Sequence, residues 1–152
     1  MKMILNRKHL SIRRNKQRGG HREKKALKWL KSRGFAVLET KSSYHSFDFF
    51  VENGGHKLLI EHKSCLDRIY SGNRKIPMRV VNGRFKIIVE NHEEMPRLAE
   101  EFLAEAKYLF QVVDANGESR FFFKNWEDID NIMGRNSRFY FLSIGRLDEN
   151  FG

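Results

Sequence analysis

Residues 47–63 read FDFFVENGGHKLLIEHK and contain two apolar runs, Phe47–Val51 and Leu58–Lys63, on either side of Asn53-Gly54-Gly55. Asn-Gly between two apolar runs is typical of a tight turn that joins antiparallel strands. The stretch therefore predicts a β-hairpin, and both of its strands carry charged residues.

Three charged side chains stand out in this hairpin, because strands of a core seldom contain charge without a partner. Side chains alternate between the two faces of a strand, so Glu61 and Lys63 share the face of Leu59, and Asp48 interrupts the first apolar run. Asp48 and Glu61 can meet across the hairpin, where two carboxylates repel unless a cation lies between them. The pattern predicts Mg²⁺ or Mn²⁺ at Asp48 and Glu61. Lys63 would orient a water or neutralise charge developing on phosphorus.

The tripeptide Glu-x-Lys alone has little weight, since it occurs four times in the chain: at Glu23, Glu39, Glu61 and Glu105. The one that starts at Glu61 closes an apolar strand and follows a strand aspartate, which gives it a context that the others lack. The alternative interpretation is a structural salt-bridge network across the hairpin.

Positive charge is concentrated at the N-terminus. Residues 1–33 hold 13 Lys and Arg against one acid, Glu23, whereas residues 34–152 hold 16 Lys and Arg against 18 acids. This distribution predicts a basic arm over residues 1–18 and a single domain over 19–152. A basic arm binds polyanions by releasing their counterions, so nucleic acid is the leading partner. A solubility tail and a membrane-surface helix are the alternatives, the latter disfavoured because residues 3–12 form no wide apolar face. The cations expected to contact backbone phosphates are Arg13, Arg14, Lys16, Arg18 and Arg22.

Composition narrows the class of protein further. A chain of 152 residues suits one domain, and its lone Cys65 excludes a disulfide framework and a zinc site built from several thiolates. A single cysteine fits a reducing, cytoplasmic environment. The sequence has no run of 18 apolar residues and no secretory signal, so neither membrane insertion nor export is expected.

The rest of the chain alternates between helical and strand patterns. Helices are predicted over 21–33, ending at Gly34, over 96–107 and over 126–132, and Glu23 lies on the apolar face of the first. Strands are predicted over 35–40 and 139–144, with hairpins at Asn82-Gly83 and Asn116-Gly117, and residues 65–75 are predicted as a loop with a short helix. The Phe121–Phe123 run is typical of a core strand or a dimer surface. The fold class is therefore α/β or α+β, with a central mixed β-sheet flanked by helices.

Four segments together resemble a known superfamily: Gly20-His-Arg-Glu23, Arg33-Gly-Phe35-Ala-Val37, Phe47-Asp48-Phe49 and Leu59-Ile60-Glu61-His62-Lys63-Ser64. They resemble the nucleases with the Asp…Glu-x-Lys motif and, within that superfamily, the archaeal Holliday junction resolvases, over roughly residues 12–64. The sequence departs from the motif at Phe47, where proline is common, and at His62, where an apolar or small residue is frequent.

The resemblance implies a restriction-endonuclease-like core. It implies that Glu23, Asp48 and Glu61 help to hold divalent metal, that Lys63 assists the attacking water, and that Ser42 or Ser43 is the family's loop serine. It also implies a homodimer, since a four-way junction needs two symmetric cuts.

The predicted function is a metal-dependent, structure-specific DNA endonuclease that resolves four-way junctions. Two alternatives stay open: a nuclease of the same fold acting on flaps, damaged DNA or restriction-type duplex sites, and a non-catalytic nucleic-acid-binding module. Charge alone does not distinguish DNA from RNA. His45, His62 and Tyr44 invite catalytic or DNA-contacting roles, although such residues more often make only structural hydrogen bonds.

Overall fold

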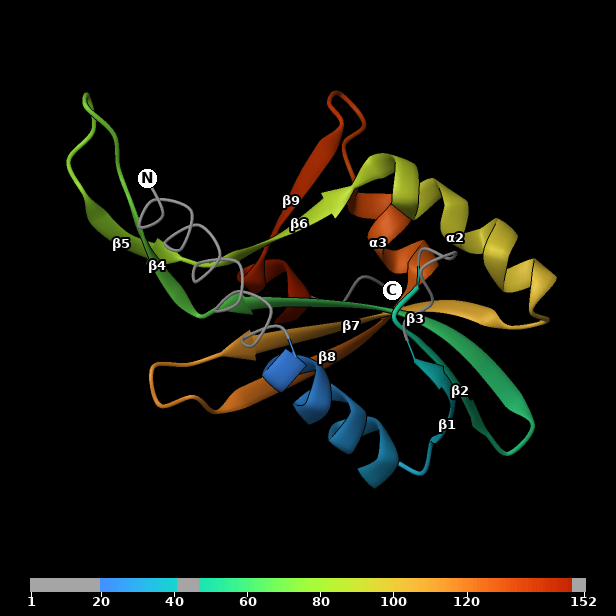
Figure 1. Ribbon diagram of the computed structural model, residues 1–152. Coiled ribbons are helices and arrows are strands. Elements are labelled where there is room, and N and C mark those ends of the chain that lie inside the picture. The colour runs from blue at the N-terminus through green and yellow to red at the C-terminus, as the bar shows by residue number, and fades with distance from the viewer. Residues whose placement is uncertain (1–19, 41–46, 149–152) are drawn as a thin grey trace, which may run out of the picture.

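A five-stranded mixed sheet forms the centre of the computed structural model, which describes residues 20–40 and 47–148 (Figure 1). Its strands lie in the order β1-β2-β3-β7-β8, with β3 and β7 parallel and the other neighbours antiparallel. Their bounds are β1 (Ala36–Thr40), β2 (Phe49–Asn53), β3 (His56–Leu66), β7 (Glu105–Val113) and β8 (Ser119–Asn125).

Helices cover both faces of this sheet, which confirms the predicted fold class (Figure 1). The N-terminal helix, residues 20–32, buries Ala26 and Leu30 against Phe49, Ile60 and Leu109. Its Trp29 stacks on Phe121 with the ring centroids 5.3 Å apart, so the predicted core role of the Phe121–Phe123 run is met on this face.

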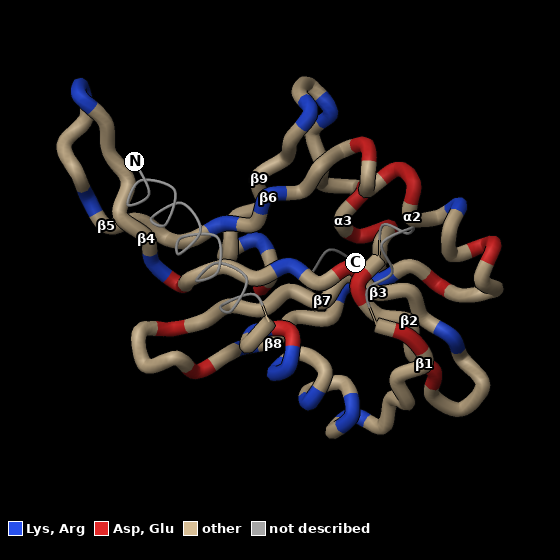
Figure 2. Tube along the Cα trace, viewed as in Figure 1, with Lys and Arg blue, Asp and Glu red and all other residues tan. Residues whose placement is uncertain are grey.

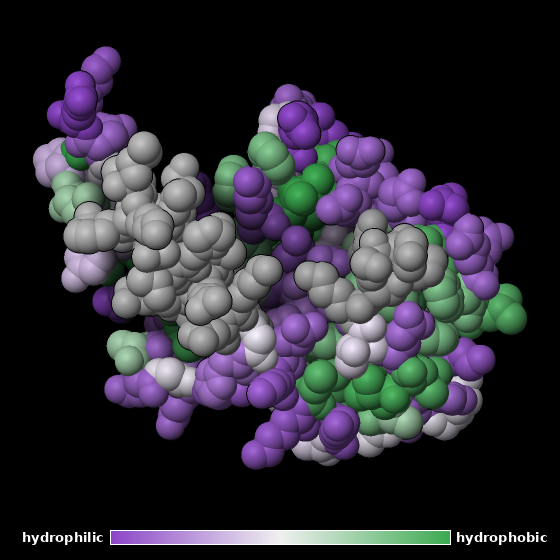
Figure 3. All heavy atoms as spheres, in the orientation of Figure 1, coloured by the Kyte–Doolittle hydropathy of each residue, from purple (hydrophilic) through white to green (hydrophobic). Residues whose placement is uncertain are grey.

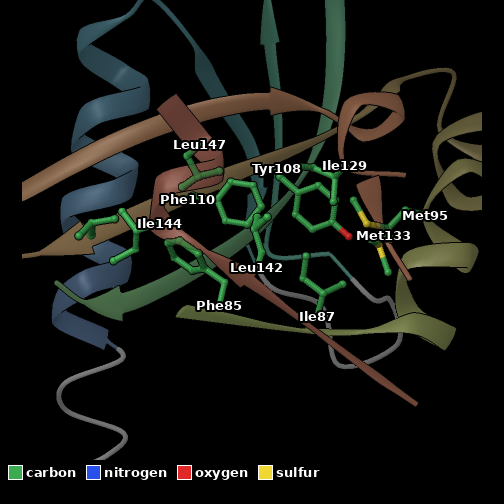
Figure 4. Packing of buried hydrophobic residues seen from close by; sticks show 11 residues of the cluster. Phe85, Ile87, Met95, Tyr108, Phe110, Ile129, Met133, Leu142, Ile144 and Leu147 are labelled. Carbon is green, nitrogen blue, oxygen red and sulfur yellow. The ribbon is translucent and has the colours of Figure 1, made fainter. Parts of the chain in front are cut away.

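Helices α2 (Val89–Glu101) and α3 (Trp126–Ile132) lie on the opposite face together with a ribbon of β6 (Arg84–Ile88) and β9 (Phe139–Ser143). Figure 4 shows the apolar cluster between them, in which Tyr108 and Phe110 of β7 meet Phe85 of β6 and Leu142 of β9. A short 3-10 helix, η1 (Ile144–Asp148), adds Ile144 to the same cluster.

Two of the three predicted hairpins are present. Strands β2 and β3 pair in register from Phe49–Ile60 to Asn53–His56, and the turn residues Gly54 and Gly55 have φ of 57° and 84°. Both central residues therefore have positive φ, which is why Asn-Gly-Gly is a good turn here. Strands β7 and β8 are also joined as a hairpin, by a longer loop over residues 114–118 in which Gly117 has φ of 79°.

The predicted hairpin at Asn82-Gly83 is wrong. Strand β5 (Arg79–Asn82) pairs with β4 (Arg68–Ser71), whereas β6 pairs with β9. Gly83 marks a close crossing of two chain segments, because a Cβ added there would lie 1.8 Å from the carbonyl oxygen of Leu66. The prediction of a loop with a short helix over 65–75 is also wrong, because β3 continues to Leu66 and β4 begins at Arg68.

The predicted helix 96–107 begins and ends too late. Helix α2 contains Pro96 in its interior, and the carbonyl of His92, which loses its usual helical donor there, accepts from the Trp126 indole N–H at 2.8 Å. The helix ends at Glu101, and the left-handed residue that follows its cap is Leu103, with φ of 53°, so no glycine marks the end of the helix in the sequence. Glu105 and Lys107 therefore belong to β7.

None of the helices in the described part of the chain combines the length and the apolar character needed to cross a membrane.

Candidate active site

Asp48 lies at the point where β2 begins. Its backbone N–H donates to the Ile60 carbonyl at 3.0 Å, which extends the β2–β3 ladder by one residue. Its side-chain Oδ2 accepts from the backbone N–H of His62 at 2.8 Å. These two bonds fix the Asp48 carboxylate against β3 at the residues that follow Ile60, and this is the pairing that the hairpin predicts.

Glu61 and Lys63 lie on one face of β3, as strand alternation requires. Lys63 Nζ is 3.6 Å from Glu61 Oε1, and the side chains keep 23% and 19% of their surface exposed, respectively. Both line a small pocket of about 10 Å³ under β6 and α2, which is roughly the room for one water. Glu61 and Lys63 therefore lie together at this pocket, and the Asp48 carboxylate interacts with Glu61 from the start of β2.

The pair of carboxylates is electrostatically strained. The pKa of Glu61 is raised to about 8, first by burial and then by the Asp48 carboxylate, while Lys63 opposes the shift. At neutral pH the two carboxylates are thus stabilised by a proton or by a cation held between them. Two carboxylates with room for water form an oxygen donor set that suits Mg²⁺ or Mn²⁺.

A buried polar chain borders the pocket on the side of α2 and β7. Tyr108 lies opposite Glu61 in the β3–β7 ladder, and its hydroxyl donates to Nδ1 of His92 at 2.7 Å. His92 Nε2 donates to Asp130 Oδ1 at 3.0 Å, and Asp130 pairs with Arg135. Burial lowers the pKa of His92 and raises that of Tyr108, with Glu61 adding to the latter, so both remain neutral. No local sequence pattern indicates these hydrogen-bonded residues, because they are scattered over β7, α2 and α3.

The opposite face of β3 carries a different set of polar groups. His62 Nε2 donates to Gln111 Oε1 at 2.8 Å, and Gln111 Nε2 donates to Ser119 Oγ at 2.9 Å. Burial lowers the pKa of His62, although the carboxylates of Asp48 and Glu23 act in the other direction. Arg22 of the N-terminal helix donates to Ser64 Oγ at 3.3 Å.

Glu23 is the predicted site residue that the structure does not bring to Glu61. Its carboxylate interacts electrostatically with the ring of His62, which lies on the face of β3 that the N-terminal helix covers. Among the described residues, no group of three or more His, Cys, Asp or Glu side chains is placed to hold a metal ion. The other predicted or considered residues lie outside the described ranges: Arg13, Arg14, Lys16, Arg18, Ser42, Ser43, Tyr44 and His45.

Comparison with known proteins gives a structural match. No family model matches the sequence, and no curated protein matches it. Among solved structures, the chain is similar to Hjc of Archaeoglobus fulgidus, a Holliday junction resolvase from an archaeal hyperthermophile, with a TM-score of 0.58 and 17% identity. The match covers 84% of this chain and 85% of that one. The mixed sheet flanked by helices is therefore the fold of that resolvase.

Proposed function

We propose that this protein is a metal-dependent DNA endonuclease that cuts branched DNA, with four-way junctions as its substrate. The observation that carries the proposal is the meeting of Asp48, Glu61 and Lys63 at the start of β2 and the middle of β3. It is supported by the fold shared with a structure whose protein is a Holliday junction resolvase.

Each of the three side chains has a task in phosphodiester hydrolysis. Asp48 and Glu61 would hold Mg²⁺ or Mn²⁺, which supplies Lewis-acid activation of a water and of the scissile phosphate. Lys63, whose ammonium lies 3.6 Å from Glu61, would orient the attacking water and neutralise charge that develops on the phosphate oxygens. Water attacks phosphorus as the bond to the leaving oxygen breaks, and the leaving oxygen takes up a proton.

The other predicted residues have supporting roles in this proposal. Glu23 is a further metal contact implied by the sequence resemblance, and we rest the metal site on Asp48 and Glu61 alone. Arg13, Arg14, Lys16, Arg18 and Arg22 would contact backbone phosphates, which positions DNA without reading its sequence. Ser42 or Ser43 would contact DNA. A homodimer would present two such sites to a junction.

The test is cleavage of labelled DNA with Mg²⁺, comparing a four-way junction, a flap and a plain duplex of equal length. Glu61→Gln should abolish cleavage and keep DNA binding. Glu105→Gln is the matched control, because Glu105 begins another Glu-x-Lys tripeptide but is exposed at the start of β7. It should cut like the wild type. Full activity of folded Glu61→Gln would rule out the proposed site.

A non-catalytic DNA-binding module is the second candidate. It is favoured by the small number of metal-ligating side chains that the described residues bring together. Tight binding of all three DNAs, with no metal-dependent cutting of any of them, would establish it in place of the nuclease.

A further inference from the structure

A second basic segment lies within the domain, between residues 68 and 88. It contains six of the 16 Lys and Arg of residues 34–152 and no acid. In the described part of the chain, no carboxylate forms an ion pair with any of the six. Its positive charge is therefore left for a partner. The six cations are Arg68, Arg74, Lys75, Arg79, Arg84 and Lys86.

Most of this segment forms a two-stranded ribbon, β4–β5, which projects away from the main sheet (Figure 1). Figure 2 shows Lys and Arg at its outer end and along its length, and Asp and Glu concentrated in α2 and α3. The ribbon has two unequal faces. Ile69 and Val81 pair on the half-buried face, whereas Tyr70 and Val80 pair on the other with 77% and 51% of their surfaces exposed.

The outer end of the ribbon has a defined shape. The side-chain oxygen of Asn73 accepts from the backbone N–H groups of Lys75 and Ile76, both at 2.8 Å. A Cβ added at Gly72 would lie 2.7 Å from the Cα of Met78, so the two sides of the loop are in close contact. The backbone of the loop is therefore held in one shape, with the exposed Arg74 and Lys75 at the tip. Figure 3 shows hydrophilic side chains there with apolar ones beside them.

The basic surface continues from the ribbon onto β6 and β9. The guanidinium of Arg84 lies 4.4 Å from the ring centre of Phe141, and Lys86 Nζ lies 3.9 Å from that of Phe139. Both cations belong to β6, the strand that follows the ribbon after Gly83. The cationic surface is thus built on ordered strands.

The ribbon is tied to the candidate active site through β3. Strand β4 follows β3 with only Asp67 between them, and Tyr70 is seven residues beyond Lys63. At about 3.3 Å per residue, these positions are at most roughly 23 Å apart. DNA rises about 3.4 Å per base pair, so this distance corresponds to roughly seven base pairs. A two-stranded β-ribbon also fits the width of the major groove.

We propose that the β4–β5 ribbon is a DNA-binding arm that holds duplex DNA up to roughly seven base pairs from the cleaved phosphate at Tyr70, and further out at its tip. This inference rests on the proposed function, since it takes DNA as the substrate. Arg74 and Lys75 contact phosphates at the tip, and the exposed face of Tyr70 and Val80 lies against the groove. We propose DNA and not a protein as the partner of the ribbon, because residues 68–88 contain six cations and no acid.

The experiment measures binding to a labelled four-way junction in EDTA across a salt series, by fluorescence anisotropy. Arg74→Ala/Lys75→Ala should weaken binding and reduce the slope of log K against log salt by about two, because each phosphate contact contributes about 0.9. Lys31→Ala/Lys57→Ala is the control, since it removes the same charge from exposed positions on the N-terminal helix and at the β2–β3 turn. It should keep the wild-type slope.

Two further measurements locate the contact and check folding. Shortening the junction arms from about 15 to about 5 base pairs should weaken the wild type and leave the Arg74→Ala/Lys75→Ala protein almost unaffected, because the shorter arms end before the ribbon. The charge-preserving variant Arg74→Lys/Lys75→Arg should bind like the wild type. This result separates loss of charge from loss of structure.

The outcomes distinguish the two proposals. A wild-type salt slope and arm-length dependence in Arg74→Ala/Lys75→Ala would overturn the arm and leave metal-dependent cleavage standing. No DNA binding by the wild type would overturn the proposed function itself, and the arm with it. If Tyr70→Ser changes the oligomeric mass without changing DNA binding, the ribbon is an interface between copies of the chain and the inference is wrong.

Discussion

The two faces of β3 differ in whether their polar side chains have hydrogen-bond or charge partners. On one face, His62 is neutral and its ring N–H is satisfied by Gln111, which is satisfied in turn by Ser119. On the other face, Glu61 is held beside a second carboxylate, and the nearest cation, Lys63, lies 3.6 Å away. Two adjacent residues of one strand thus differ in role. His62 belongs to a set of satisfied hydrogen bonds, whereas Glu61 belongs to a pair of carboxylates that requires a cation or a proton.

The largest expected effect is a difference in cleavage rate between substitutions on the two faces of β3. Lys63→Met should lower the cleavage rate by roughly 10²–10³-fold, because it removes the ammonium that faces the developing negative charge. His62→Leu, on the adjacent residue but the other face, should change the rate much less. Single-turnover cleavage of the junction with saturating protein measures both. Equal losses in the two variants would mean that the faces do not differ in function.

The carboxylate pair should also make the metal-free protein sensitive to pH. Glu61 binds its proton more tightly in the folded state, where its pKa is about 8, than as an ordinary glutamate side chain, which titrates at 4.5. Its contribution to stability is therefore complete below about pH 4.5 and is lost as the pH rises to about 8, by an amount on the order of a few kcal/mol.

Denaturant titrations in EDTA at pH 6.5 and pH 8.5 test this expectation. The wild type should lose more stability between these values than Glu61→Gln, whose amide does not titrate. His62 and His92, with lowered pKa values, act in the opposite direction mainly below about pH 6.5 and are common to both proteins. Added Mg²⁺ should restore the wild type at pH 8.5, whereas parallel loss in the two proteins would contradict the shift.

Substitutions on the face of β3 that carries His62 should change stability more than activity. Gln111→Leu removes the partner of both His62 and Ser119 in the middle of the sheet, which should cost about 1–3 kcal/mol of unfolding free energy. Tyr108→Phe is a comparison on the other face, since it leaves Nδ1 of buried His92 without its donor. Urea unfolding gives both values. A neutral Gln111→Leu would show that the His62 chain does not contribute to stability.

The smallest expected effect concerns the link from the N-terminal helix to β3. Ser64→Ala removes the acceptor of a 3.3 Å hydrogen bond from Arg22, at a half-buried position. It should lower stability by no more than about 1 kcal/mol. Junction binding should be unchanged or slightly stronger, because Arg22 becomes available to a phosphate. A marked loss of binding would instead show that Ser64 itself positions Arg22 for DNA.

The sequence predicts correctly those parts of the fold that depend on neighbouring residues. The hairpin at Gly54-Gly55, the helix that ends before Gly34 and the pairing of Asp48 with β3 all depend on residues close together in the sequence. Asn82-Gly83 does not form the predicted turn, because glycine suits both a turn and a close crossing of two segments. Only the position of Leu66, which is distant in the sequence, distinguishes the two.

Other features depend on contacts that are distant in the sequence. The end of α2 at Glu101 has no glycine signal, because Leu103 takes the left-handed conformation there. The missing donor at Pro96 is compensated by Trp126, 30 residues later. The chain from Tyr108 through His92 to Asp130 exists only once three elements have packed. The basic ribbon was hidden because the acids of α2 and α3 cancel its charge when residues 34–152 are averaged.

The two tryptophans of the chain lie on opposite layers of the molecule. Trp29 stacks on Phe121 under the N-terminal helix, and Trp126 donates its indole N–H to the carbonyl of His92 where α3 meets α2. Each is therefore a fluorescent reporter of one layer, and replacing either with phenylalanine would leave a signal from the other alone. Emission from the two single-tryptophan proteins would reveal whether the layers separate from the sheet together or one at a time.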